Sequence, residues 1–235
     1  MILAPQDGRL LVVTQNDHAH LAAELLSLWR RDGLPEHPRR RQLLVAAREH
    51  DNGWREADSA PRCDRESGRP LDFVAVPQEL RREIWRRGVE RFRSRDAWVA
   101  LLILQHAISL HRSLEDDEEW APLLGEWRRT RQELLDESAA PAEDLDQDYR
   151  WIELTDLLSL GLCSGWSRRR ELHGYRIELR PGELRLNPFP FAGATTFRVA
   201  GRTIEDRPYG GDADLGVELA TARWQQTRVR VAPAG

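Results

Sequence analysis

The stretch Leu43–Trp54, with the sequence LLVAAREHDNGW, combines the end of a buried helix with two residues that are able to bind a metal ion. Leucine and alanine residues at positions 43–47 form an apolar helical face, and the Asn-Gly pair near the end of the stretch predicts the helix terminus. His50 and Asp51 lie at that terminus, so both side chains can turn toward one point. An imidazole and a carboxylate are costly to bury without a partner. The pair is therefore either solvated or holds a partner, and our hypothesis is that it holds a metal ion to which other helices contribute ligands.

Composition and charge exclude several classes of protein. The 235 residues suit one domain with an appendage or two small domains. A net charge of −4 gives no electrostatic basis for binding nucleic acid or an anionic membrane surface. All 35 basic residues are arginine, which excludes a Schiff-base lysine and a phosphate-loop lysine. Cys63 and Cys163 are too far apart in sequence for a CxxC metal site and form no disulfide framework.

Nothing in the sequence indicates export or membrane insertion. The N-terminal segment lacks a cationic start and a long apolar run, so we expect no signal peptide. No stretch approaches the roughly 20 apolar residues that a membrane-spanning helix needs. We therefore expect a cytoplasmic protein without membrane or nucleic-acid partners.

The periodicity of the chain changes near Gly165. Before it, amphipathic and apolar patterns predict a helical body, interrupted by a loop rich in proline and glycine over residues 55–77. After it, residues alternate with period two, and Pro181-Gly182 between YRIELR and ELRLNP predicts a hairpin. TTFRVAGRTI, VELATA and TRVRVA are expected to be further strands.

These patterns predict a mainly α fold, a helical bundle with a small C-terminal antiparallel β-sheet. The expected organisation is an N-terminal strand in residues 1–14 that can join the sheet, a helical metal-binding domain in residues 15–170, and a β appendage in residues 171–235. The β appendage offers a surface for a homodimer.

Polar residues within apolar helical patterns are the candidate metal ligands. The expected set is His18, His50, Asp51, His106 and Asp156. Asp156 is the strongest, because leucines surround it in sequence and a buried carboxylate needs a cation or several donors. Histidine and carboxylate ligands suit Fe, Mn, Co, Ni or Zn, and the donor types do not choose among these divalent metals.

Several neighbouring residues leave alternatives open. His20 competes with His18 for the first ligand position, and His111 is a candidate ligand for a second metal ion. His37 and His173 are expected at the surface. Glu49 is a candidate for orienting a histidine ligand, and Trp54 for lining the pocket or packing in the core. An arginine of the long loop is expected to clamp an anionic substrate; the candidates are Arg62, Arg65 and Arg69.

The order of these residues resembles the HD-domain superfamily of metal-dependent phosphohydrolases. The resemblance is carried by His18, the adjacent His50-Asp51 pair and Asp156, with His106 where many members place a further ligand or catalytic histidine. The segments NDHAHLA, EHDNGW, LILQHAISLH, TDLLSLGLC and LNPFPF also resemble an uncharacterised bacterial family of proteins of unknown function. The resemblance implies an HD-domain-like helical bundle around a metal ion that acts on phosphate esters.

Three functions follow as hypotheses. The first is metal-assisted hydrolysis of a small phosphorylated or anionic substrate, in which the metal generates hydroxide near neutral pH. Asp51 and His106 are its expected catalytic residues, and His106 either binds the metal or orients the leaving oxygen. The second is a di-metal oxygenase or a hydratase on the same site. The third is a non-catalytic metal-binding or scaffold protein.

Overall fold

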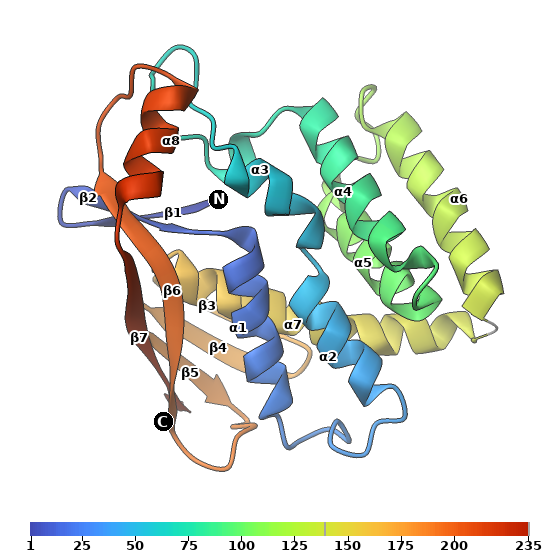
Figure 1. Ribbon diagram of the computed structural model, residues 1–235. Coiled ribbons are helices and arrows are strands. Elements are labelled where there is room, and N and C mark those ends of the chain that lie inside the picture. Colours follow the sequence, from blue (N-terminus) through green and yellow to red (C-terminus); the bar gives the residue numbers. More distant parts are fainter. Residues whose placement is uncertain (139, 235) are drawn as a thin grey trace.

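The protein combines a large curled β-sheet with a layered set of helices (Figure 1). The computed structural model describes residues 1–138 and 140–234. In chain order the elements are β1 (Ile2–Gln6), β2 (Arg9–Val13), α1 (Gln15–Ser27), α2 (Arg40–Glu49), the 3-10 helix η1 (Asn52–Trp54), α3 (Arg55–Ser59), η2 (Phe73–Ala75), α4 (Gln78–Arg93), α5 (Ala97–Leu110), η3 (Arg112–Leu114), α6 (Ala121–Ser138), α7 (Ala142–Cys163), β3 (Arg168–Leu172), β4 (Tyr175–Arg180), β5 (Glu183–Asn187), β6 (Thr195–Glu205), α8 (Asp212–Thr221) and β7 (Trp224–Pro233).

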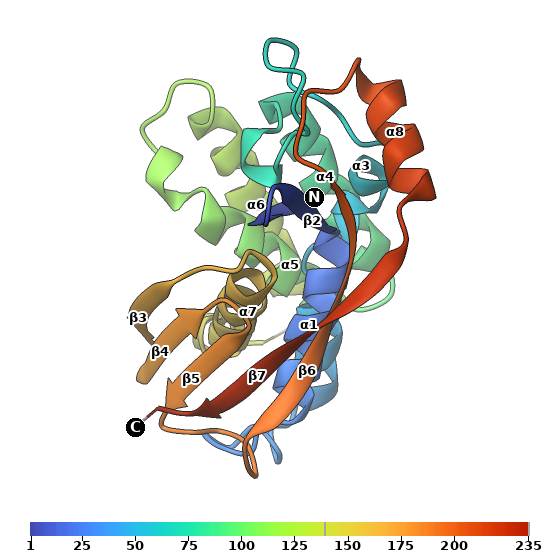
Figure 2. The same ribbon diagram turned by 90° about the vertical axis from the view of Figure 1, so that its left-hand side faces the viewer.

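The seven strands form one mixed sheet in the order β1-β2-β6-β7-β5-β4-β3. β5 and β7 run parallel, and the other neighbouring pairs run antiparallel. β2 pairs with β6, with Leu10 opposite Ile204, so the N-terminal strands lie in the same sheet as the C-terminal ones. The sheet is strongly curled. Figure 2 shows its two long strands, β6 and β7, running across it.

The prediction of a mainly α fold with a small C-terminal antiparallel sheet was wrong. The chain is 50% helical and 21% strand, and the sheet takes strands from both ends of the sequence. Local alternation indicates single strands, but it carries no information on pairing across almost the whole chain. The parallel β5–β7 pair also requires a crossover, which β6 and α8 provide.

Residues 217–222, VELATA, do not form the strand that their composition suggested. Most of them belong to α8, whose Leu215 and Leu219 are buried one helical turn apart. Asp212 and Asp214 lie in the first turn, where carboxylates favour a helix N-terminus. The spacing of the two leucines therefore determines the element, and the short alternation within VELATA does not.

The helices cover the two faces of the sheet unequally. α1 and α7 pack against one face, and α2, α4, α5 and α6 lie beyond them, so the helical layers extend away from the sheet (Figure 1). Trp29 joins the two parts, with ring centroids 5.9 Å from Trp151, 5.0 Å from Tyr175 and 5.5 Å from Phe191. α8 packs against β6 within a second, smaller cluster that includes Leu10, Val12 and Ile204.

α5 is the most deeply buried helix of the bundle. Asp96 caps its N-terminus by accepting a hydrogen bond from the backbone N–H of Val99, and residues 98–108 are all buried. The helix carries His106 in this apolar environment. In the described part of the chain, no helix is both long and apolar enough to cross a membrane.

Candidate metal centre

Four helical segments bring the five expected ligands to one buried point. α1 supplies His18, the end of α2 supplies His50 and Asp51, α5 supplies His106 and α7 supplies Asp156. Their exposed fractions are 1%, 1%, 5%, 1% and 9%. Since α1, α2, α5 and α7 pack against one another, the polar side chains meet where these apolar faces converge.

The turn after α2 sets the direction of the His50-Asp51 pair. α2 ends at Glu49, and η1 begins at Asn52. The Asn52 side chain donates hydrogen bonds to the backbone carbonyls of Glu49 at 2.7 Å and of Gly88 in α4 at 3.1 Å. These bonds fix the turn against α4, so the two metal-competent side chains point into the bundle.

Hydrogen bonds at Nδ1 of His18 and His50 determine the tautomer of each ring, and therefore which atom faces the cluster. His50 Nδ1–H donates to the Ala47 carbonyl at 2.8 Å, because a carbonyl can only accept. Ser159 donates its hydroxyl hydrogen to the Asp156 carbonyl at 3.0 Å, so it accepts from His18 Nδ1–H, also at 3.0 Å. In both neutral rings Nε2 then carries a lone pair directed at carboxylates. Such an arrangement requires a proton or a metal cation between the groups.

The spacing of the donor atoms is compatible with metal binding in two overlapping groups that share His50. His18 Nε2 lies 2.9 Å from Asp51 Oδ2, and His50 Nε2 lies 3.3 Å from Asp156 Oδ1 and 3.7 Å from Asp51 Oδ2. His106 Nε2 is 4.0 Å from Asp156 Oδ2. Two ligands bound at about 2.1 Å are roughly 3.0 Å apart at a right angle and roughly 4.2 Å apart on opposite sides.

The relation of His50 to its neighbours supports the same conclusion. His50 Nε2 is buried and has no hydrogen-bond partner among the described residues, although Asp156 Oδ1 is only 3.3 Å away. The two groups are close without being aligned for a hydrogen bond, as expected when both face a third position. Buried groups of the right chemistry to hold a metal ion are therefore present, as His18-His50-Asp51 and as His50-His106-Asp156.

Electrostatics within the cluster favour a cation. Burial opposes the charged form of Asp51, but His50 and His18 outweigh it and hold the pKa of Asp51 below its ordinary value. The pKa of Asp156 is also lowered, because the nearby His50, His106 and His18 outweigh the effect of burial. Burial likewise opposes the imidazolium of His50, yet Asp51 and then Asp156 raise the pKa of His50 to about 9. In the metal-free protein, the proton on His50 supplies a positive charge beside the two carboxylates, as a metal cation would.

His106 differs from His50 in its protonation. Burial lowers the pKa of His106 to about 4, and the attraction of Asp156 offsets this only in part. Its Nδ1 lies 3.1 Å from the Tyr149 hydroxyl, which orients the ring with Nε2 toward Asp156. His106 is therefore neutral near pH 7 and able to bind a metal ion or accept a proton.

A cavity of about 170 Å³ leads from the centre to solvent. Its lining includes His18, Asp51, His106 and Asp156 at the inner end, together with the side chains of Trp54, Trp85, Phe73 and Leu160. Val74 and Leu110 also line it and are 64% and 54% exposed, so they lie toward the solvent. The site is thus reached through a small, largely apolar passage.

Arg81 of α4 lines the same cavity. Its Nε donates to the Val76 carbonyl at 3.2 Å and its Nη2 to the Val74 carbonyl, while no carboxylate of the described residues lies within 4.0 Å of it. Burial lowers its pKa from a very high ordinary value, so the guanidinium stays charged. An uncompensated cation beside the candidate metal centre is suited to binding an anionic substrate.

The loop arginines are placed elsewhere. Arg62, Arg65 and Arg69 are absent from the cavity lining, and Arg69 pairs with Asp206. Glu49 pairs with Arg55 at 2.6 Å and does not orient a ligand histidine. Trp54 is buried and also lines the cavity, so it is both a core residue and a pocket residue.

His20 and His37 lie outside the cluster. His20 is half-buried on another face of α1, with Nε2 3.4 Å from Asn16 Nδ2. His37 was expected at the surface but is partly buried, and its Nε2 lies 3.2 Å from the buried Asp148 carboxylate. The same carboxylate accepts a hydrogen bond from Arg39 at 2.6 Å. His37 therefore has a structural role in holding the loop before α2 against α7.

His111 and His173 also lie outside the cluster of candidate ligands and contact other residues. His111 Nδ1–H donates to the Ala107 carbonyl at 2.8 Å, and its ring stacks on Trp120 with centroids 4.5 Å apart. It lines the cavity but belongs to no metal-competent group among the described residues. His173 is exposed and pairs with Glu153 at 2.7 Å. The structure thus offers no observation in favour of a second metal ion at His111.

Two residues that contact the candidate ligand histidines were not identified from the sequence. Ser159 and Tyr149 contact His18 and His106, and both lie on α7 with Asp156. They are three residues after and seven residues before Asp156, which is the spacing of one helical face. That spacing is a signal that could have identified them.

Comparisons with known proteins show the family of this chain. Residues 1–206 match a family described as "Protein of unknown function (DUF3891)", and the chain belongs to that family. No curated protein and no solved structure gives a significant match. The family match covers every residue of the candidate metal centre but leaves α8 and β7 outside it.

The two perturbed histidines predict a stability maximum near pH 6.5 for the metal-free protein. His50 has a pKa raised to about 9, so its contribution is complete below 6.5 and is lost as pH rises toward 9. His106 has a pKa lowered to about 4, so its neutral burial costs stability as pH falls from 6.5 toward 4. We expect the free energy of unfolding to fall by on the order of 2 kcal/mol between pH 6.5 and 8.5.

Chemical denaturation of chelator-treated protein at pH 5, 6.5 and 8.5 measures this profile. His173→Gln, which removes an exposed histidine, should leave the profile unchanged. Added metal should reverse the alkaline limb, because metal binding requires unprotonated His50. A metal-free protein as stable at pH 8.5 as at 6.5 would contradict the charge balance described here.

Proposed function

We propose that this protein is a metal-dependent hydrolase that acts on a small anionic substrate. The observation that carries the proposal is the convergence of His18 Nε2 and His50 Nε2 on the Asp51 and Asp156 carboxylates, which lie at the inner end of a cavity. The resemblance to HD-domain phosphohydrolases, which stays a prediction, is the reason to choose a phosphate ester as the scissile group. Cytoplasmic location, the absence of nucleic-acid and membrane partners, and a homodimer formed through the β appendage stay predictions as well.

The donor set suits a divalent metal of the group Fe, Mn, Co, Ni and Zn. Such an ion supplies Lewis-acid chemistry, since it polarises a phosphoryl oxygen and lowers the pKa of water. His18, His50, Asp51, Asp156 and His106 would hold it. Ala47 and Ser159 keep the histidines in the tautomer that binds through Nε2.

The other residues of the cavity have distinct tasks. Arg81 binds the anionic group of the substrate and positions it toward the centre. His106, neutral near pH 7, can accept a proton at Nε2 if that atom is not a ligand. Trp54, Trp85 and Phe73 narrow the passage and limit water around the reacting group. A cavity of about 170 Å³ is smaller than the roughly 300–1,000 Å³ of pockets that enclose a drug-sized ligand, which favours a small reacting group.

Elemental analysis combined with a hydrolysis assay tests the function. We expect about one metal ion per chain in the purified protein. We also expect hydrolysis of p-nitrophenyl phosphate that a chelator abolishes and one of the five metals restores. Bound metal without hydrolysis of any phosphate ester or other anionic ester in a broad panel would favour the scaffold hypothesis. Absence of bound metal, with no rise in melting temperature on adding these metals, would exclude the metal centre itself.

Arg81→Gln is expected to raise KM for an anionic substrate by roughly tenfold or more, with a smaller change in kcat. The reason is that Arg81 contacts the bound anion and has no structural carboxylate partner among the described residues. Steady-state kinetics measure the two constants separately. Arg82→Gln is the matched control, because Arg82 is the exposed neighbour on the same helix. An equal effect of both variants would remove Arg81 from the substrate site.

A further inference from the structure

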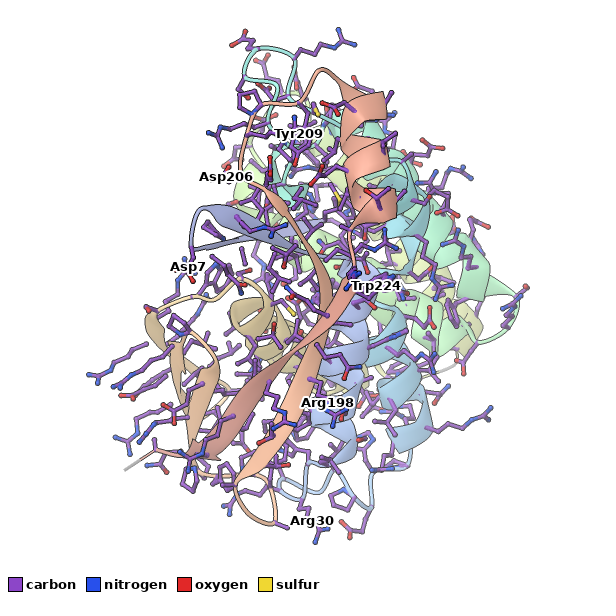
Figure 3. The ribbon with its side chains drawn as sticks, turned by 60° about the vertical axis from the view of Figure 1, so that its left-hand side comes forward. Asp7, Arg30, Arg198, Asp206, Tyr209 and Trp224 are labelled. Carbon is purple, nitrogen blue, oxygen red and sulfur yellow. The ribbon has the colours of Figure 1, made fainter. Side chains whose placement is uncertain are left out.

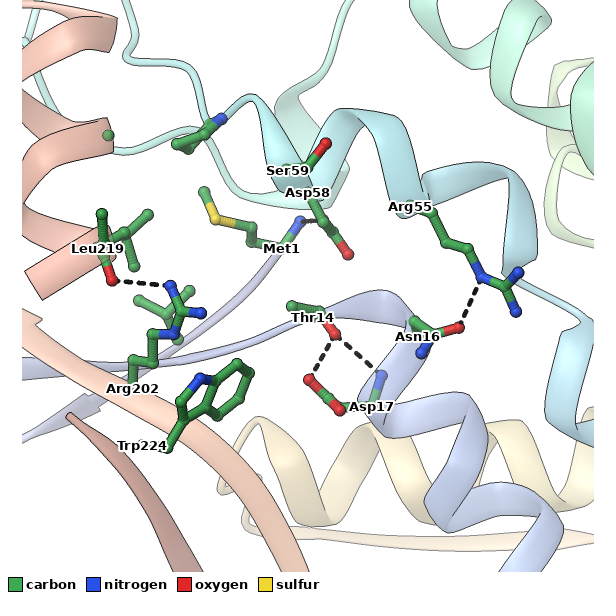
Figure 4. Close-up of a pocket in the computed structure, with 14 residues that line it drawn as sticks. Met1, Thr14, Asn16, Asp17, Arg55, Asp58, Ser59, Arg202, Leu219 and Trp224 are labelled. Carbon is green, nitrogen blue, oxygen red and sulfur yellow. Dashed lines mark hydrogen bonds and ion pairs between the residues drawn. The ribbon is translucent and has the colours of Figure 1, made fainter. Parts of the chain in front are cut away.

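A second and larger cavity lies on the other side of the first turn of α1 (Figure 4). Its volume is about 530 Å³, within the range typical of small-molecule sites. Its walls come from the start of α1, from α3, from β6, and from α8 and β7. None of the expected metal ligands lines it, so it is separate from the candidate metal centre.

Arg202 of β6 lines this cavity and has no ion-pair partner among the described residues. Its Nη1 donates to the Leu219 carbonyl at 2.7 Å, and its guanidinium lies 4.3 Å from the Trp224 ring centroid. Its Nε is buried and has no hydrogen-bond partner among the described residues. No carboxylate in the described part of the chain lies within 4.0 Å of the guanidinium. Nη2 makes no hydrogen bond among the described residues and is not one of the buried unsatisfied atoms, so its N–H groups can donate to an anionic group in the cavity.

Asp17 of α1 lines the same cavity and also has no ion-pair partner among the described residues. Thr14 caps the helix by accepting a hydrogen bond from the Asp17 backbone N–H at 3.0 Å, and its hydroxyl donates to Asp17 Oδ2 at 2.6 Å. No cationic group of the described residues lies within 4.0 Å of this carboxylate. Asp58, by contrast, is fully used, because it accepts from the Met1 ammonium group at 2.7 Å and from the Gln15 backbone N–H at 2.6 Å.

The wall beside Arg202 is apolar. Val12, Leu219 and Trp224 contribute to it, and Trp224 is 55% exposed, which is unusual for so large a ring. Figure 4 shows Arg202 and Trp224 together on one side of the cavity and Asp17 at the start of α1 on another. The cavity therefore presents a cation, an anion and an aromatic surface from different directions.

From this arrangement we propose that the cavity binds a small zwitterion with an apolar side group, of the class of the α-amino acids. Arg202 and Asp17 share one cavity without pairing with each other, so each is free for the opposite charge of a ligand. The ligand carboxylate accepts from Arg202, its ammonium group donates to Asp17, and its side group packs on Trp224 and Leu219. Charge-assisted hydrogen bonds of this kind are the stronger ones in proteins. The proposal does not depend on the hydrolase function.

Isothermal titration calorimetry with L-phenylalanine and L-leucine tests this site. We expect both to bind at millimolar concentration or below. 3-Phenylpropionate, which lacks the ammonium group, and 2-phenylethylamine, which lacks the carboxylate, should each bind more weakly by roughly tenfold or more. Chelator treatment of the protein should leave binding unchanged, which separates this site from the metal centre.

Two variants connect the binding to its residues. Asp17→Asn retains an acceptor for Thr14 but removes the charge, and Arg202→Gln removes the cation. Each should weaken amino-acid binding by roughly tenfold or more. Arg198→Gln is the control, because Arg198 lies on the same strand but away from Trp224 (Figure 3) and outside the cavity lining. Circular dichroism spectra confirm that the variants are folded.

The results divide clearly. Binding of both amino acids that is weakened by both variants supports the proposal. Failure of the wild-type protein to bind either amino acid overturns it. Equal binding of one of the singly charged analogues, or binding that is unaffected by Asp17→Asn and Arg202→Gln, also overturns it.

Discussion

Asp51→Ala is expected to empty the metal centre. Asp51 Oδ2 faces both His18 Nε2 at 2.9 Å and His50 Nε2 at 3.7 Å, so it lies between two other ligands. Loss of groups that merely orient metal ligands lowers metal affinity by about 10- to 100-fold, and loss of a direct ligand should cost at least roughly 100-fold. Elemental analysis should find little metal in the variant, and hydrolysis should fall with the metal content.

Two further variants keep this result interpretable. Asp51→Asn retains the shape of the side chain and can donate its amide N–H to the His18 Nε2 lone pair, but it removes the charge, so it should also lose metal while remaining folded. Asp146→Ala removes an exposed aspartate from α7, the helix that carries Asp156, and should retain full metal content. Full metal content in folded Asp51→Ala would show that Asp51 is no ligand.

Gly53→Ala should be the most disruptive glycine-to-alanine change among the described glycines. A Cβ at position 53 would lie 1.9 Å from the backbone oxygen of Ile84 and 2.8 Å from its carbonyl carbon. Since the obstacle is the backbone of α4, no side-chain rotation relieves the clash, and η1 and α4 must separate. We expect a loss of about 3 kcal/mol or more in the free energy of unfolding. Urea denaturation measures this change.

The same variant should also reduce metal affinity. η1 directly follows Asp51, and α4 carries Trp85 and Arg81 of the cavity wall. Gly125→Ala in α6 is the control, because a Cβ there would meet only the end of the Arg129 side chain at 3.7 Å. It should raise stability by up to about 1 kcal/mol, since alanine favours a helix over glycine. A Gly53→Ala protein of normal stability would show that η1 and α4 are not packed this closely.

The candidate ligand residues could be selected from sequence because their chemistry conflicts with their local pattern. Asp156 and His106 interrupt apolar helices, and a polar residue at such a position needs a partner wherever the helix packs. The structure places them together with His18 and the His50-Asp51 pair. Local sequence was sufficient here because each signal lies within one helix.

The arginine that lines the cavity could not be found in this way. Arg81 lies in the segment QELRREIWRR, where nothing local distinguishes it from Arg82, and only the packing of α4 directs it into the cavity. The long-loop arginines were preferred because their loop leaves directly from the ligand pair. The loop instead runs toward β6 and its following turn, where Arg69 meets Asp206. Helix packing determines these positions, and no short-range pattern reports it.

The role of Gly53 was equally hidden. The Asn-Gly pair predicts a helix end, and α2 does end just before it. The pair has a second task, however, because Asn52 bonds Gly88 and Gly53 gives α4 room to approach. This contact joins segments more than thirty residues apart, as the Asn52–Gly88 separation of 36 residues shows. The sheet was misjudged for the same reason, since the pairing of β2 with β6 places Leu10 opposite Ile204, far apart in the sequence.

The position of β7 has a consequence for how the protein matures. β7 is the last strand in the sequence but lies in the middle of the sheet, between β6 and β5. Until residues 224–233 are available, β1, β2 and β6 form one ribbon and β3, β4 and β5 form another, with no backbone hydrogen bonds between them. During synthesis the nascent chain therefore presents two unprotected ribbon edges, which are prone to pair with other chains. Because β7 alone connects the two ribbons, the seven-stranded sheet can be completed only after β7 has been synthesised.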